Sequence, residues 1–168
     1  MQAPGPDEEL LLELLNSRPV FDGVERDRFA DDGELREWSR AHGGSGSAPE
    51  AELLRLTRDR LQDVVRGAAE PASLAQALDG VSRVPELDEN GVTWQQSAPP
   101  DSRLAARLVL AWAHIQEHLP GRLRPCGNDE CRLFLLDLSN ANRARWCSMA
   151  TCGNRMKARR HYRRSRAR

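Results

Sequence analysis

The stretch PCGNDECRLFLLDLSNANRARWCSMATCGNR, residues 125–155, decides how this chain folds, because it holds every cysteine of the 168-residue sequence. The cysteines form two C-x4-C pairs separated by a 15-residue spacer, and they are Cys126, Cys131, Cys147 and Cys152. Two such pairs, with enough chain between them for a hairpin, let four thiolates surround one tetrahedral zinc ion. Four thiolate ligands leave no open position for water, so the spacing predicts a single structural zinc site.

The cellular compartment expected from the sequence favours metal binding by the cysteines over disulfide formation. The first 18 residues carry acidic side chains before and inside a leucine run, whereas a secretory signal begins with basic residues. No stretch reaches the ~18 consecutive apolar residues that a membrane span needs. We therefore expect a cytoplasmic protein without membrane contact. Cytoplasmic thiols stay reduced, so paired cysteines there favour metal binding, and two disulfides are the alternative.

The net charge of zero is the sum of two oppositely charged parts. The whole chain has 25 basic and 25 acidic residues, and residues 121–168 have 13 basic and 3 acidic ones, which gives about +10. Residues 1–120 keep the remaining 12 basic and 22 acidic residues, or about −10. Such an asymmetry is typical of a basic segment that binds a partner.

Helical periodicity dominates residues 1–120, which we expect to form a mostly helical domain. Apolar spacing predicts helices at residues 8–18, 31–41, 49–67 and 103–119, and a shorter one at 71–78. Residues 81–96 alternate with a period near two around Asn90-Gly91, which predicts a β-hairpin with a loop longer than two residues. Residues 42–47, rich in glycine and serine, have the composition of a flexible linker.

The first helix is predicted from four leucines on one face, Leu10, Leu11, Leu14 and Leu15, with Asp7 placed as the cap. Asn16, Ser17 and Arg18 follow it, directly before Pro19. These three residues have two interpretations: a helix C-terminal cap and turn, or a candidate ligand-binding site.

The cysteine-containing part, residues 121–168, is predicted to be a small module after the helical domain. The apolar run at residues 132–138 predicts one strand, and residues 143–146 a second strand returning to Cys147. Ser148 is placed to cap a helix from about residue 149 through 162, with Cys152 near its start. The fold class is therefore mainly α, with a small hairpin in the helical domain and a short β-hairpin plus a basic helix in the zinc module.

The residues Trp146-Cys147-Ser148-Met149, then Cys152-Gly153-Asn154-Arg155, with Lys157 and Tyr162 following, resemble the CGNR zinc finger. The upstream Cys126 and Cys131, with Phe134, Asp137 and Ser139, resemble it as well. The preceding chain is similar to the ABATE domain, a family described as a stress-induced transcription regulator, through the LELLNS stretch at residues 12–17 and through Leu35 and Trp38. The resemblance implies zinc at the four cysteines, a treble-clef-like module and a DNA-binding regulatory role.

The C-terminal helix and tail supply the independent argument for nucleic acid. Eight cations fall in the 14 residues 155–168, a density that binds phosphate by counterion release whatever the base sequence. The candidate nucleic-acid-binding residues are Arg155, Lys157, Arg159, Arg160, Arg163 and Arg164. A solvated tail, or a helix paired with the acidic domain, is the alternative interpretation of the same charge run.

The predicted function is a zinc-containing, DNA-binding transcriptional regulator whose N-terminal domain senses a ligand or partner. The first alternative is an interaction adaptor that places the basic helix on an acidic protein, and a homodimer is compatible with either. A small-molecule-binding protein or enzyme using the helical domain is the third reading. The sequence contains no phosphate-binding loop, nucleophile-elbow or H-E-x-x-H motif, so it leans away from an enzyme and predicts no catalytic residues.

Overall fold

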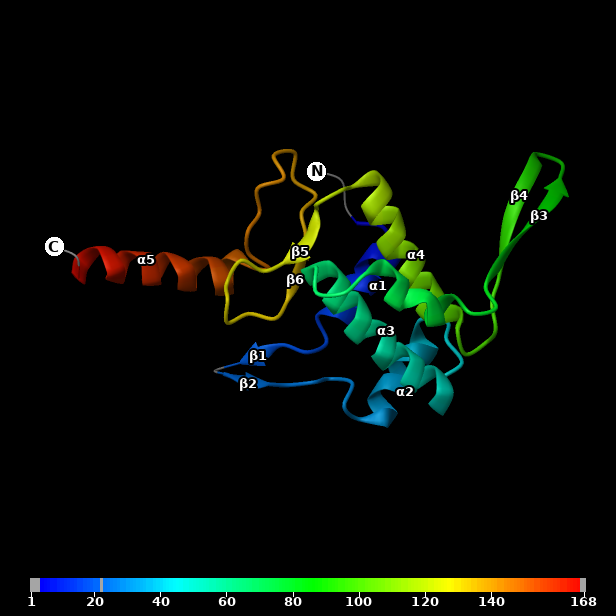
Figure 1. Cartoon of the computed structure of the whole chain (residues 1–168), viewed down its shortest axis with the longest axis horizontal. Coiled ribbons are helices and arrows are strands. Elements are labelled where there is room, and N and C mark those ends of the chain that lie inside the picture. The colour runs from blue at the N-terminus through cyan, green and yellow to red at the C-terminus, as the bar shows by residue number, and fades with distance from the viewer. Residues whose placement is uncertain (1–3, 22, 167–168) are drawn as a thin grey trace. The chain divides into compact units, whose positions relative to one another are not determined.

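The computed structural model describes residues 4–21 and 23–166, apart from the side chains of Phe21, His161 and Arg163. The chain forms two compact units: a terminal unit of Met1–Asp27 and Ile115–Arg168, and a central unit of Arg28–His114. Within the described residues the strands pair into three two-stranded antiparallel sheets, and the rest of the regular structure is helical (Figure 1). The prediction of a mainly α fold with small hairpins is confirmed. No helix in the described ranges is long and apolar enough to cross a membrane.

The central unit is built on helices that begin and end where the sequence predicts. These are α2 (Asp32–Ala41), α3 (Ala48–Arg66), the 3-10 helix η1 (Pro71–Leu78) and α4 (Arg103–His118), whose last turn belongs to the terminal unit. Asp31 Oδ1 accepts the Glu34 N–H at 2.9 Å in α2, and Ser47 Oγ accepts the Glu50 N–H at 3.1 Å in α3, so both helices begin with a side-chain cap. Gly67 ends α3 with a φ of 73°, a conformation that favours glycine.

The buried face of α3 differs from the predicted one. We expected Leu53, Leu56, Leu61, Val64 and Val65 to face inward, but of these only Leu61 is buried. The other buried residues are Ala51, Leu54 and four polar ones, Glu50, Thr57, Arg58 and Gln62. Apolar periodicity missed this face because polar side chains occupy part of it.

Residues 42–47 form a tight loop and not the flexible linker that their composition predicts. The Glu50 carboxylate, fully buried, accepts the Gly46 N–H at 2.7 Å and the Ser45 hydroxyl at 3.2 Å. The Arg36 guanidinium donates to Gly46 O at 2.7 Å. Gly44 lies against Ser39 Oγ and Glu50, where a Cβ would not fit. The loop is thus organised by a buried carboxylate, which composition does not reveal.

The β-hairpin of the central unit consists of β3 (Ser82–Asp88) and β4 (Gly91–Ser97), seen as the long pair of strands in Figure 1. Asp88 pairs with Gly91, so the loop has two residues and the prediction of a longer loop is wrong. Gly91 tolerates this tight turn with a φ of 123°. Almost the entire hairpin is exposed, including Leu87 and Trp94.

The terminal unit joins both ends of the chain. Helix α1 (Pro6–Leu15) buries its four predicted leucines, and Gly5, not Asp7, is its N-cap because the helix begins two residues earlier than expected. A short hairpin of β1 (Val20–Phe21) and β2 (Val24–Glu25) follows, which the sequence did not predict. Helix α1 packs on β6 (Phe134–Leu136). The leucine face therefore belongs to the same unit as the cysteines.

The strands of the cysteine module pair differently from the prediction. Strand β6 pairs with β5 (Leu123–Pro125), which precedes Cys126, so the two strands flank the first cysteine pair. Residues 143–146 form no strand, and the prediction of a second strand there is wrong. Their place is fixed instead by single bonds such as Gly127 N–H to Arg145 O at 2.7 Å. Ser148 caps a π-helical turn (Met149–Gly153), which leads into α5 (Asn154–Arg166).

Candidate metal centre and basic helix

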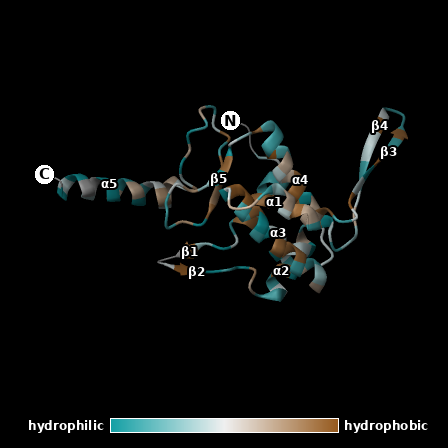
Figure 2. Cartoon of the chain, in the orientation of Figure 1, coloured by the Kyte–Doolittle hydropathy of each residue, from teal (hydrophilic) through white to brown (hydrophobic). Residues whose placement is uncertain are grey.

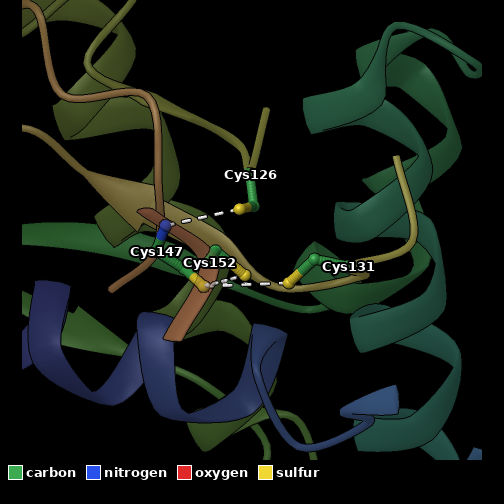
Figure 3. Close-up of side chains that lie close together, drawn as sticks. All are labelled: Cys126, Cys131, Cys147 and Cys152. Atoms are coloured by element: carbon green, nitrogen blue, oxygen red, sulfur yellow. Dashed lines mark hydrogen bonds between the residues drawn. The ribbon is translucent and has the colours of Figure 1, made fainter. Parts of the chain in front are cut away.

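The four cysteines converge on one point. Their Sγ atoms all lie within 4.8 Å of one another, and none forms a disulfide (Figure 3). Cys147 Sγ is 3.7 Å from Cys131 Sγ and 3.7 Å from Cys152 Sγ. Cys126 follows β5, Cys131 closes the turn after it, and Cys152 lies in the turn that starts the last helix. Two separate parts of the module thus supply two thiols each.

This donor set fits a zinc ion. A tetrahedral ion with Zn–S bonds near 2.3 Å places its ligand sulfurs about 3.8 Å apart. Two of the observed separations already have this length, and the largest exceeds it by about 1 Å. Four sulfurs and no other donor are the ligands of a closed structural zinc site, not of a catalytic one. Within the described ranges, no other group of three or more metal-ligating side chains is found.

Two N–H groups point at the sulfurs and would stabilise them as thiolates. The Cys147 N–H donates to Cys126 Sγ at 3.4 Å, and the buried Asn128 amide donates to Cys152 Sγ at 3.5 Å. Donors of this kind orient metal ligands. From the sequence, Asn128 fits a turn after Cys126, and no contact with a sulfur was predicted for it. The repeated tripeptide Cys-Gly-Asn, at 126–128 and again at 152–154, is the signal that marks it.

Without metal, burial favours the protonated form of two of the thiols, Cys131 and Cys147. Burial is the main reason that the pKa of Cys131 is raised to about 11, and burial also raises the pKa of Cys147. Burial acts on Cys152 in the same direction, but hydrogen bonds from Asn128 and from the neighbouring thiols outweigh it and lower that pKa. A bound cation must therefore displace protons, which makes metal affinity depend on pH.

A buried carboxylate holds the segment between the cysteine pairs. Asp137, 3% exposed, accepts from the Ser139 hydroxyl at 2.6 Å, from the Ala144 N–H at 2.7 Å and from Arg124 at 2.7 Å. The Ser139 bond is the largest reason that the pKa of Asp137 is lowered to about 2. Arg124 also donates to Ala144 O at 2.7 Å. These bonds fix residues 139–144 without a strand.

Trp146 lies beside Gly127 and Gly153, the glycines of the two turns that contain the Cys-Gly-Asn tripeptides; we call these turns the knuckles. A Cβ on Gly127 would be 3.4 Å from Cζ3 of the indole and 3.0 Å from Arg145 O, and a Cβ on Gly153 would be 3.3 Å from the indole Cδ1. The guanidinium of Arg145 lies over the indole, 5.4 Å from its centroid. Trp146 therefore lies near both Cys-Gly-Asn tripeptides, although a Cβ would meet Arg145 O first at Gly127 and the Met149 side chain first at Gly153.

Helix α5 carries the candidate nucleic-acid-binding residues. Arg155, Lys157, Arg160 and Arg164 are exposed, and the side chain of Arg163 lies outside the described residues. Arg159 donates to Glu130 at 2.5 Å, which raises the pKa of Arg159 and lowers that of Glu130. Figure 2 shows hydrophilic colours along most of the helix. Its main packing is against the turn that precedes it.

The candidate ligand residues after α1 have structural partners. The Asn16 side chain donates to Phe134 O at 3.2 Å and accepts the Phe134 N–H at 2.7 Å, bridging 118 positions of sequence. Ser17 is buried, and Arg18 pairs with Asp27 at 3.2 Å. Asn16 also ends α1, as its cap interpretation predicts. A ligand role for these three residues stays a prediction.

The fold and the site define a class: a mainly helical protein with a four-thiolate zinc-finger module at its C-terminal end. Comparison with family models agrees with this. Residues 122–165 match the CGNR zinc finger, and residues 8–120 match the family described as "Putative stress-induced transcription regulator" (ABATE). The chain belongs to the ABATE family and carries a CGNR zinc finger. A comparison with curated proteins found no significant match. The division into folding domains at residue 120 stays a prediction.

Proposed function

We propose that this protein is a DNA-binding transcriptional regulator, in which Cys126, Cys131, Cys147 and Cys152 hold one structural zinc ion. The metal would hold together the two knuckles and the first turn before α5. A small module of this kind gains much of its folding free energy from the metal, about 10 to 16 kcal/mol for isolated finger peptides at neutral pH. The chain's own thiols supply the closed ligand set and Asn128 supports one of them.

The observation that carries the proposal is the exposure of α5 together with its charge. Its 13 residues contain seven cations and no carboxylate. Only Arg159 among the cations with described side chains has a carboxylate partner within ion-pair distance. Cations that face water along one helix can neutralise successive phosphates of a nucleic-acid backbone. The family description, a transcription regulator, points to DNA as that nucleic acid.

The test is the salt dependence of binding to duplex DNA by the zinc-loaded full chain. Fluorescence anisotropy with a labelled duplex of random sequence gives the affinity at several salt concentrations. The logarithm of the association constant should fall linearly with the logarithm of salt, by about 0.9 for each phosphate neutralised. Arg160→Ala and Arg164→Ala should each reduce this slope by about 1. Arg60→Ala, an exposed arginine on α3, is the matched control and should leave the slope unchanged.

The outcomes separate the functional classes. Affinity that does not respond to salt, or that the two α5 variants leave unchanged, contradicts phosphate binding by this helix. An absence of DNA binding, with a stoichiometric complex between zinc-loaded protein and an acidic protein, supports the adaptor. Selection of bound genomic fragments then tests whether the protein reads sequence or only backbone, since phosphate contacts alone carry no sequence information.

A further inference from the structure

A cavity of about 480 Å³ lies beside the first turns of α5, on the terminal unit. Among the described residues, four cations line it, Arg145, Lys157, Arg159 and Arg160, and no carboxylate does. Arg145 comes from the segment before Cys147, and the other three come from α5. The charge run of the last helix predicts its three cations, but not Arg145, as nucleic-acid-binding residues. The fold therefore adds a cation to the group and places the group around a concave surface.

The rest of the wall is apolar. It is formed by the indole of Trp146 and the thioether of Met156, both partly exposed, with Gly153 between. The indole is held by the close approach of Gly127 and Gly153, so it is positioned before any ligand arrives. An aromatic ring in a cationic groove is the arrangement on which unpaired nucleic-acid bases stack, and Arg145 already lies over that ring.

The charges are available to a ligand. Within the described part of the chain, Lys157 and Arg160 make no ion pair, whereas Arg159 pairs with Glu130. An inorganic anion would not need the indole and thioether, and an apolar ligand would not need four cations. The volume falls in the range of sites for small organic ligands, about 300 to 1,000 Å³. A ligand with a planar group joined to a phosphate would contact both parts of the wall, the planar group on the apolar side chains and the phosphate on the cations.

We propose that this cavity binds one nucleotide, with its base on Trp146 and Met156 and its phosphate on Lys157 and Arg160. The proposal deepens the proposed function and rests on it where the nucleotide belongs to a DNA strand. A base inside a regular duplex is stacked and paired, so the cavity selects an unpaired nucleotide, at a bulge, an end or a single strand. A free nucleotide offers the same chemistry.

The experiment compares four probes with the zinc-loaded full chain: an intact duplex, the same duplex with one bulged base, an unstructured single strand and adenosine monophosphate. Anisotropy gives the affinity for the DNA probes, and tryptophan quenching reports contact with a base. Loss of one base–aromatic stack costs about 5- to 150-fold in affinity, so the bulged duplex should bind more tightly than the intact one by a factor in that range. Trp146→Phe should remove most of the quenching, because the other three tryptophans lie outside the cavity.

Variants separate the cavity from the helix charge. Met156→Ala removes part of the surface under the base, and Arg145→Ala removes the cation over the indole, so both should reduce the preference for the bulge, with zinc content unchanged. Arg164→Ala lies on α5 outside the cavity and should weaken all DNA probes by one common factor. Trp146→Leu should abolish the preference; because Trp146 contacts both knuckles, the two other cavity variants carry the conclusion if this one loses zinc.

The outcomes distinguish the nucleotide site from the proposed function. Equal affinity for intact and bulged duplex without quenching overturns the nucleotide site and leaves backbone binding by α5 intact. Saturable quenching by adenosine monophosphate, without binding of any DNA, keeps the site and overturns the proposed function. No response to any probe overturns both.

Discussion

The bond pair between Asn16 and Phe134 gives the sharpest test of how the zinc module is built. Asn16→Ala removes a side chain that accepts the Phe134 N–H at 2.7 Å and donates to Phe134 O at 3.2 Å. Phe134 is 1% exposed, so water cannot easily replace the lost partner. The substitution leaves a buried donor and a buried acceptor on β6.

The expected cost follows from those two groups. Each intramolecular hydrogen bond contributes about 0.5 to 1.5 kcal/mol net, and each buried group left unsatisfied costs about 1 to 3 kcal/mol. We expect a loss of about 2 to 4 kcal/mol for the terminal unit. Strand β6 pairs with β5, and these two strands flank Cys126 and Cys131, so the same loss should weaken zinc binding by about 30- to 900-fold if the pair forms only with the metal-bound fold.

Two measurements report the effect. Competition with a chromophoric chelator gives the zinc affinity, and hydrogen exchange gives the protection of the Phe134 amide, which donates directly to Asn16. Asn16→Asp keeps the acceptor but replaces the donor with an oxygen facing Phe134 O, so it should also lose affinity. Asn140→Ala, an exposed asparagine in the turn after β6, is the control and should change neither quantity. Zinc affinity and Phe134 exchange both within two-fold of wild type in Asn16→Ala would refute the reasoning.

Three further predictions concern the module. Gly127→Ala places a Cβ 3.0 Å from the backbone oxygen of Arg145, which cannot rotate away, so zinc affinity should fall by about 5- to 150-fold. In Gly153→Ala the new Cβ meets mainly the flexible Met149 side chain, so the loss of zinc affinity should be smaller. An equally large loss in Gly153→Ala would contradict this steric argument. Asp137→Asn should lower the thermal unfolding midpoint at pH 7. Because the pKa of Asp137 is lowered to about 2, the stability that this carboxylate contributes is complete above the unfolded pKa of about 4 and declines as the pH falls from about 4 to about 2. An unchanged midpoint at pH 7 would show that the hydrogen bonds of Asp137 are dispensable. Removal of zinc by a chelator should abolish hydrogen-exchange protection of the β5 and β6 amides while those of α3 stay protected, and retained protection in β6 would argue against a metal-dependent module.

Local signals predicted most of the helices and the metal cluster. The leucines of α1 and the matched cysteine pairs each act over a few residues, so spacing alone identifies them. The clustering of the four thiols also needed no structure, because a C-x4-C pair is a local turn and a second pair must come to it.

Long-range pairing was beyond the same reasoning. The apolar run after Cys131 was correctly predicted as a strand, but its partner lies before Cys126 and not after Asn142, and strand propensity does not specify partners. Asn16 resembles an ordinary helix cap until residue 134 is beside it. The cationic cavity was missed for the same reason, since Arg145 and α5 come together only through the fold of the module.

The parts of the terminal unit are synthesised at different times. Helix α1 is made before the other parts of its unit, which beyond Asp27 begin only at Ile115, and Phe134 follows Asn16 by 118 residues. At about 5 to 20 residues per second, Phe134 is made roughly 6 to 24 s after Asn16. During that interval the leucine face of α1 lacks the strand on which it packs. We therefore expect nascent α1 to be bound by chaperones and released when residues 115–168 emerge and the cysteines meet.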